Sequence, residues 1–277
     1  MSRAVRCIAA AAIGHAAPVI RYRAGTGEPL LLVHGLGLAW RCWKPILPAL
    51  ERVHRVVAVD LPGFGEAPPF DGTPPTVDAL ADAVEADLDA AGLDDVHVAG
   101  NSLGGWIGLE LARRGRARSV VALAPSGLEL PPERAYVISL NETMRLRARA
   151  AARVAGLVAS NALTRTAVLA PMRTRPWRVP HDDAAAEIRD FGRSPGFQPT
   201  IRWTVATRAA SGLREIDVPA RVCFGTRDVM LGALTAPRFA AAIPQADLVP
   251  LPGCGHVPMV DAPDRVARAI TEVTARD

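Results

Sequence analysis

A serine flanked by glycines, Ser102, is the residue whose type and setting point most directly to chemistry. It lies in the segment 98–105 (VAGNSLGG), where a short apolar run gives way to a helical pattern. At so sharp a strand-to-helix turn the backbone is strained, and Gly100 and Gly104 supply the small neighbours that it needs. The pattern predicts a nucleophile elbow with an exposed hydroxyl. Because a serine hydroxyl is a poor nucleophile at neutral pH, a base and an acid must come from elsewhere in the chain.

A histidine and an aspartate in the C-terminal part can serve as that base and acid. His256 lies in the segment 251–258 (LPGCGHVP), just after the last predicted strand, where a base could reach Ser102. Asp228 lies in the loop that leaves the preceding strand, and an acid there could orient the histidine. Glu129, the only carboxylate near the end of the strand before that, is the weaker alternative. The predicted chain order is therefore Ser, Asp, His.

A glycine-rich turn, 33–37 (VHGLG), follows a buried strand and can aim backbone N–H groups at a developing negative charge. We expect Leu36 and Leu103 to donate their main-chain amides to this oxyanion hole. Their side chains matter less than the backbone shape that the neighbouring glycines set. His34 in the same turn is interpreted as a structural histidine that hydrogen-bonds a loop.

Short apolar runs recur along the chain, separated in most places by amphipathic patterns, and this alternation predicts a parallel sheet covered by helices. The runs cover 30–33, 55–59, 96–99, 119–123, 221–224 and 246–249, and the expected helices cover about 40–50, 76–91, 103–115, 233–242 and 262–275. Thr76 is a plausible N-cap for the second of these helices. The segments 7–13 and 19–23 read as an antiparallel hairpin before the first of the runs, which makes about eight strands.

About ninety residues separate the strand that ends near 123 from the strand that begins near 221, where one helix would suffice. We predict a helical lid over residues 128–217, inserted into a core made of 1–127 and 218–277. Arginines spaced three or four apart in this insertion are interpreted as one solvated helix face.

Composition excludes several classes of protein. Apolar residues make up 49% of the 277 residues and charged residues 22%, which is ordinary for a folded globular chain. A net charge of +4, spread along the chain, does not indicate a basic surface that binds nucleic acid. The four cysteines form no C-x-x-C pair, so neither a zinc site nor a disulfide framework is expected, and a reducing, cytoplasmic location fits. No apolar run is long enough to span a membrane.

Taken together, these residues make the chain resemble the α/β-hydrolase superfamily over nearly its whole length. The resemblance is specific in four places: the turn 34–37, the turn 60–65 (DLPGFG), the elbow 100–104, and Asp228 with His256. Glu66, where a serine is common, and Met230-Leu231, where a Val-Pro pair is frequent, depart from the family pattern and put the subfamily in doubt. The resemblance implies an α/β fold, with a mostly parallel sheet flanked by helices.

The expected activity is hydrolysis of a carboxylic ester, or of a related acyl bond such as a lactone, thioester or amide, in a small or medium apolar substrate through an acyl-enzyme, without a metal or organic cofactor. Serine at the elbow argues against dehalogenases and epoxide hydrolases, whose resemblance would require an aspartate there. Trp40, Trp43, Trp177 and Trp203 are the expected lining of an apolar substrate pocket. Two alternatives stay open: a C–C bond hydrolase acting on a ring-cleavage product, and a ligand-binding homologue with little turnover.

Overall fold

The computed structural model describes residues 19–206 and 210–276, and these contain a seven-stranded sheet. Its spatial order is β1-β3-β2-β4-β5-β6-β7. Every neighbouring pair is parallel except β1 with β3, which is antiparallel. The strands are β1 (Ile20–Ala24), β2 (Glu28–Val33), β3 (His54–Val59), β4 (Val96–Asn101), β5 (Ala117–Leu123), β6 (Ala220–Gly225) and β7 (Asp247–Leu251).

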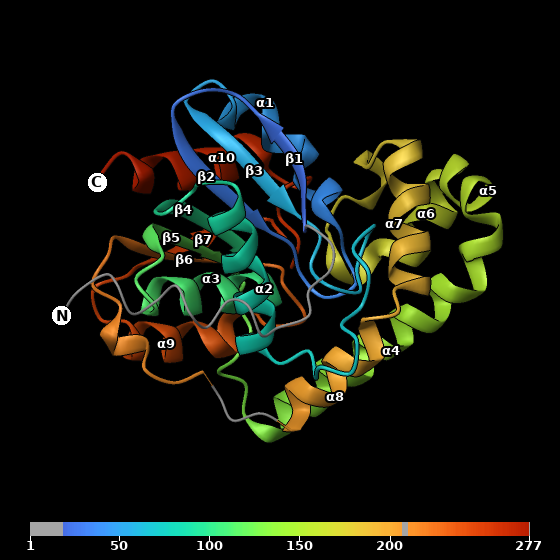
Figure 1. Ribbon diagram of the computed structural model, residues 1–277. Coiled ribbons are helices and arrows are strands. Elements are labelled where there is room, and N and C mark those ends of the chain that lie inside the picture. Colours follow the sequence, from blue (N-terminus) through green and yellow to red (C-terminus); the bar gives the residue numbers. More distant parts are fainter. Residues whose placement is uncertain (1–18, 207–209, 277) are drawn as a thin grey trace.

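The central strands are apolar on both faces because helices cover both sides of the sheet. Figure 1 shows α1 (Leu47–Leu50) and α10 (Pro263–Thr274) on one side, and α2 (Val77–Ala90), α3 (Leu103–Arg113) and α9 (Gly232–Ala242) on the other. Leu30, Leu31 and Leu32 of β2 are accordingly inaccessible to solvent. The alternation of strand and helix that the sequence predicts is confirmed.

The predicted helices form, with one local difference. Thr76 caps α2 as expected, since its side-chain oxygen accepts a hydrogen bond from the Ala79 amide at 3.1 Å. The segment expected as a single helix over 40–50 is instead a 3-10 helix, η3 (Trp40–Ile46), followed by α1. Pro45 lies inside η3 and offers no N–H for an α-helical ladder, which explains why the regular helix begins only after it.

The long interval between β5 and β6 is helical. It contains α4 (Pro131–Ala151), α5 (Ala155–Ser160), α6 (Ala162–Leu169), α7 (His181–Arg193) and α8 (Phe197–Ala206), with short 3-10 turns between some of them. These helices lie beside the sheet, beyond the ends of the strands, and α7 packs on both α4 and α5 (Figure 1). They join the core through aromatic residues: Phe191 and Phe197 lie against Gly37, where an added Cβ would come within 2.7 Å of the Phe191 ring.

The first strand of the expected hairpin, over 7–13, lies outside the described residues. Its expected partner forms β1, which pairs with β3 at the edge of the sheet. None of the helices in the described parts of the chain combines the length and the apolar composition needed to cross a membrane.

Candidate functional site

Ser102 lies at the turn between β4 and α3, in a conformation that few residues other than glycine adopt. Its backbone has φ 56° and ψ −115°. The turn is tight because a Cβ at Gly100 would collide with the carbonyl of Gly104, and one at Gly104 would collide with the carbonyl of Val33. The glycines of the motif are therefore required where backbone approaches backbone, and the side chain of Ser102 remains half-buried at the edge of a cavity.

His256 and Asp228 meet as a hydrogen-bonded pair. Nδ1 of His256 lies 2.9 Å from Oδ2 of Asp228, so the ring donates through Nδ1 and leaves Nε2 available. The other carboxylate oxygen of Asp228 accepts the amides of Met230 at 2.7 Å and Leu231 at 3.1 Å. Burial alone would raise the pKa of Asp228, but the His256 charge and these hydrogen bonds outweigh it and hold the pKa below its usual value. The carboxylate is thus ionised and fixed in direction.

The loop that carries His256 is fastened on both sides of the histidine. The Gly255 amide donates to the buried carboxylate of Asp261 at 2.8 Å, and the Val257 amide donates to the Met172 carbonyl at 2.8 Å. The same Asp261 carboxylate accepts the amides of Thr174 and Arg175. Because residues 172–175 belong to the helical insertion, this insertion and the histidine loop share one set of anchors.

Asn101, next to Ser102, supplies a third anchor that the sequence did not single out. Its Nδ2 donates to the carbonyl of His256 at 2.9 Å and to the carbonyl of Leu123 at 3.1 Å. Both partners are acceptors, so the amide orientation follows from the contacts themselves. Asn101 is fully buried and joins the end of β4, the end of β5 and the histidine loop. It is a positioning residue for His256.

Ser102 and His256 line the same cavity. This cavity is partly open to solvent. Most of its walls are apolar side chains from the turn after β2, from the loops after β6 and β7, and from the insertion. The apolar walls are Leu36, Leu38, Leu103, Val137, Ile138, Met172, Phe191, Ile201, Met230, Leu231 and Val257.

Three polar residues from the start of the insertion also line this cavity. Glu129 is buried, and both of its carboxylate oxygens accept the Gly127 amide at 3.0 Å. Burial raises the pKa of Glu129. Its hydrogen bonds go to Gly127 and not to His256, so the weaker alternative for the acid is not the residue paired with the histidine. Arg134 and Asn141, both on α4, are the other two.

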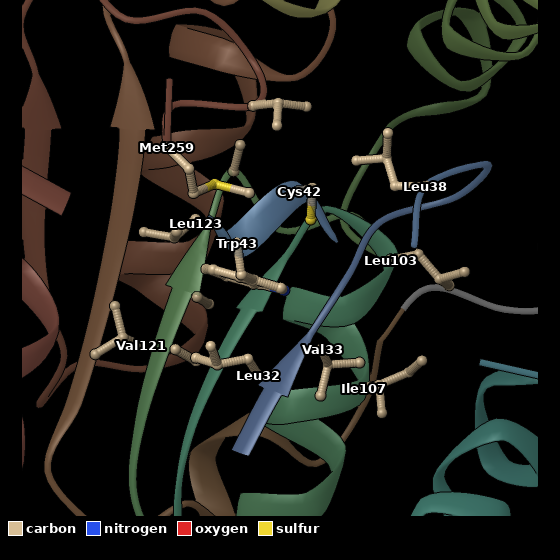
Figure 2. Packing of buried hydrophobic residues seen from close by; sticks show 14 of the residues in the cluster. Leu32, Val33, Leu38, Cys42, Trp43, Leu103, Ile107, Val121, Leu123 and Met259 are labelled. Carbon is tan, nitrogen blue, oxygen red and sulfur yellow. The ribbon is translucent and has the colours of Figure 1, made fainter. Parts of the chain in front are cut away.

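The four tryptophans expected to line the pocket do not line it, and this expectation is wrong. Trp43 is fully buried in the core, where Figure 2 shows it near Leu32 and Leu123. Trp40 stacks on Tyr22, with ring centroids 4.9 Å apart. Trp177 and Trp203 are 52% and 40% exposed. Phe191 is the aromatic residue that the insertion contributes to the cavity instead.

The glycine-rich turn after β2 lies where the sequence places it. Leu36 and Leu103 both line the cavity, and the Leu103 amide, at the first position of α3, has no acceptor within the helix. His34 is structural, as expected. Its Nε2 accepts the Leu61 amide at 2.9 Å, its Nδ1 donates to the Gly35 carbonyl at 2.8 Å, and burial lowers its pKa. Within the described residues, no cluster of three or more histidine, cysteine or acidic side chains is arranged to hold a metal ion.

Comparisons with known proteins agree with this architecture. A family model described as "Alpha/beta hydrolase family" matches residues 30–269. Epoxide hydrolase EphH of Mycobacterium tuberculosis is 33% identical over 203 residues, 69% of this chain and 92% of that protein. The 2-hydroxymuconate semialdehyde hydrolase of a Pseudomonas species is 27% identical over 269 residues, 91% of this chain and 88% of the relative.

Among solved structures, a thermophilic esterase from Thermogutta terrifontis is similar, with a TM-score of 0.71 and 25% identity over 92% of each chain. The family match covers most of the chain, and the fold and the elbow sequence fit it. The chain therefore belongs to the alpha/beta hydrolase family.

Proposed function

We propose that the protein is a serine hydrolase that cleaves a carboxylic ester of a small or medium apolar substrate through an acyl-enzyme. The observation that carries this proposal is the hydrogen-bonded pair of His256 and Asp228, whose histidine lines the same cavity as a serine at a strained elbow. Hydrolysis of an ester through an acyl-serine intermediate uses this combination of nucleophile, base and fixed acid.

In the proposed mechanism, His256 removes the hydroxyl proton as Ser102 attacks the ester carbonyl, and the amides of Leu36 and Leu103 stabilise the oxyanion. His256 then protonates the leaving alcohol. Asp228 holds the imidazole in the tautomer protonated at Nδ1 and stabilises its cation. Water activated by the same histidine attacks the acyl-enzyme and releases the acid. The insertion, residues 128–217, acts as a lid that closes the apolar cavity.

Serine at the elbow is poorly suited to epoxide hydrolysis, the reaction for which one of the relatives is named. Opening an epoxide with a carboxylate produces an ester, which water can hydrolyse to regenerate the enzyme. Opening it with the Ser102 hydroxyl would produce an ether, which has no carbonyl for an activated water to attack, so the enzyme would not be regenerated. Serine at the elbow therefore favours acyl chemistry, or C–C cleavage next to a carbonyl, over epoxide hydrolysis.

A second candidate is a C–C bond hydrolase, and the position of Arg134 favours it. This arginine lines the cavity from α4, where it could contact a carboxylate of the substrate. The similarity to a 2-hydroxymuconate semialdehyde hydrolase also supports this candidate. If this candidate is correct, Arg134→Gln will lower turnover of a carboxylate-bearing diketone far more than hydrolysis of an uncharged acetate ester.

The test is hydrolysis of p-nitrophenyl esters, from acetate to long acyl chains, by the wild type and by Ser102→Ala. Ser126→Ala is the matched control because Ser126 lines the same cavity. We expect a loss of more than roughly a thousand-fold in kcat for Ser102→Ala and a change of only a few-fold for Ser126→Ala. Full ester hydrolysis by Ser102→Ala would refute the serine mechanism. A folded wild type without ester turnover would favour the C–C candidate.

A further inference from the structure

The insertion carries a long stretch of positive charge without any negative charge. Residues 143–181 contain eight arginines and no aspartate or glutamate. Two of these arginines are neutralised by neighbours outside the stretch: Arg145 pairs with Glu142 at 3.2 Å, and the buried Arg173 pairs with Glu187. Among the described residues, Arg147, Arg149, Arg153 and Arg178 are exposed and take part in no ion pair. A merely solvated helix face would ordinarily alternate charges of both signs.

Four arginines of the insertion line one surface groove, here called the arginine groove. Arg145, Arg149 and Arg153 follow one another at intervals of four residues along α4 and the turn after it, and Arg193 faces them from α7. Gly192 makes this juxtaposition possible, because a Cβ there would come within 2.7 Å of the α4 backbone at Ala148 and Arg149. Arg149, Arg153 and Arg193 take part in no ion pair among the described residues and repel one another at this spacing, so the groove gains stability when an anion occupies it.

The same part of the molecule exposes large apolar side chains. Of the eleven most exposed in the described residues, five lie between residues 146 and 177: Leu146, Val154, Leu157, Leu163 and Trp177. Leu157 on α5 is 74% exposed and Leu163 on α6 is 80% exposed. They flank one turn, since the Thr164 hydroxyl donates to the Val158 carbonyl at 2.6 Å. Exposed leucines in the same segment as unpaired arginines are typical of surfaces that lie against anionic lipid.

We propose that the insertion docks on an anionic lipid surface, with headgroup phosphates in the arginine groove and Leu157 and Leu163 inserted at the level of the acyl chains. The charge of the stretch 143–181 selects an anionic partner, and the exposed leucines select a lipid over a dissolved anion. Docking at this surface is independent of the ester hydrolysis proposed above. The groove nevertheless reaches the cavity wall, because Arg145 lies 5.6 Å from the ring of Phe197, which packs on the cavity residue Phe191.

The experiment is co-sedimentation of the full chain with vesicles of phosphatidylcholine alone and of phosphatidylcholine mixed with phosphatidylglycerol. The wild type should bind only the anionic vesicles, and less tightly as salt rises. Each arginine near an anionic surface contributes roughly five-fold in partitioning, so the triple variant Arg149→Gln, Arg153→Gln, Arg193→Gln should bind about 100-fold more weakly. Leu157→Ser with Leu163→Ser should bind roughly ten-fold more weakly while keeping the same salt dependence.

A matched control removes the same charge elsewhere. Arg52, Arg55 and Arg268 are exposed on the core. Replacing these three with glutamine should leave vesicle binding within a few-fold of the wild type. Circular dichroism and thermal unfolding of every variant separate loss of binding from loss of fold.

Three results would overturn the proposal. The first is failure of the folded wild type to bind anionic vesicles. The second is equal loss of binding in the groove and control triple variants, which would mean that only net charge matters. The third is a dimer in sedimentation that the leucine substitutions dissociate without affecting vesicle binding. Inorganic pyrophosphate serves as a competitor, and tight binding of it by a protein that ignores vesicles would assign the groove to a soluble phosphate.

Discussion

Replacing Asn101 with alanine should lower the stability of the protein. It should also lower kcat, because His256 is displaced. The side chain donates to two buried carbonyls, those of His256 and Leu123. Leu123 keeps the Ser102 amide as a partner at 2.9 Å, whereas Asn101 supplies the only hydrogen bond identified to the His256 carbonyl within the described structure. Loss of two hydrogen bonds, with one carbonyl left buried and unpaired, should lower the free energy of unfolding by about 2 to 4 kcal/mol.

The kinetic consequence follows from the position of that carbonyl. The histidine loop stays attached through Gly255 and Val257, so the variant folds, but His256 itself gains freedom. A displacement of about 1 Å at a catalytic group can lower the rate roughly a hundred-fold. We therefore expect kcat to fall by about ten- to a hundred-fold, with KM nearly unchanged because the cavity walls stay in place.

Asn141→Ala is the control for this prediction. Asn141 is also a buried asparagine that lines the cavity, but its Nδ2 donates to the Val137 carbonyl within α4, which the helix ladder already satisfies. Its loss should cost less than about 1 kcal/mol. Urea unfolding measures the stabilities, and p-nitrophenyl ester hydrolysis below the unfolding range measures kcat and KM. Equal losses of stability in the two variants, or an unchanged kcat in Asn101→Ala, would refute the anchoring role.

Three further predictions concern the acid Asp228, the aromatic residues of the insertion and the carboxylate of Asp190 on α7. Asp228→Asn should lower kcat roughly ten-thousand-fold without unfolding the protein, and a fall of less than ten-fold in ester hydrolysis would contradict its role. Phe191→Ala should shift the preferred acyl chain length, whereas Trp177→Ala should leave the ester profile unchanged. Burial raises the pKa of Asp190 from 3.8 to about 6, so the folded state binds its proton more tightly and loses stability as pH rises through this interval. Asp190→Asn removes this loss, so the variant should be up to about 3 kcal/mol more stable than the wild type above pH 6 and equally stable near pH 3. Urea unfolding at the two pH values measures the difference. Equal stability of variant and wild type at both pH values would contradict the prediction.

The sequence was sufficient to predict at which edge of the sheet the candidate site lies. Ser102 and Asp228 follow the buried strands β4 and β6, His256 follows the last strand, β7, and parallel strands end at the same edge of a sheet. Residues far apart in the chain could therefore be expected to lie together without knowing any distance. The anchors of the histidine loop were not predictable in this way. The Asp261 carboxylate accepts the Gly255 amide, and the Met172 carbonyl accepts the Val257 amide. No local sequence pattern encodes hydrogen bonds of this kind between a side chain or carbonyl and the backbone of another segment.

The tryptophans show where aromatic content misleads. A large aromatic side chain is expected to be buried or to lie at an interface, but the sequence does not say against which surface. Trp40 finds Tyr22 on β1, and Trp43 fills the core behind the turn. Phe191 reaches the cavity region because Gly37 lacks a side chain in its path, and this complementarity joins two segments more than 150 residues apart.

The polar side chains in the cavity wall could not be predicted from the sequence for a different reason. Their position has a consequence for the kind of substrate that fits. Arg134, Val137, Ile138 and Asn141 follow the spacing i, i+3, i+4, i+7, so one face of α4 points into the cavity. From sequence, the polar ends of such a face look like ordinary solvated positions. A cover over a purely hydrocarbon substrate would be expected to be apolar along the whole face, because a polar side chain that such a ligand covers loses contact with water and gains no hydrogen bond from the ligand. Together with Glu129, these side chains favour a substrate that is apolar near Ser102 and carries a hydrogen-bonding group at the end that contacts α4.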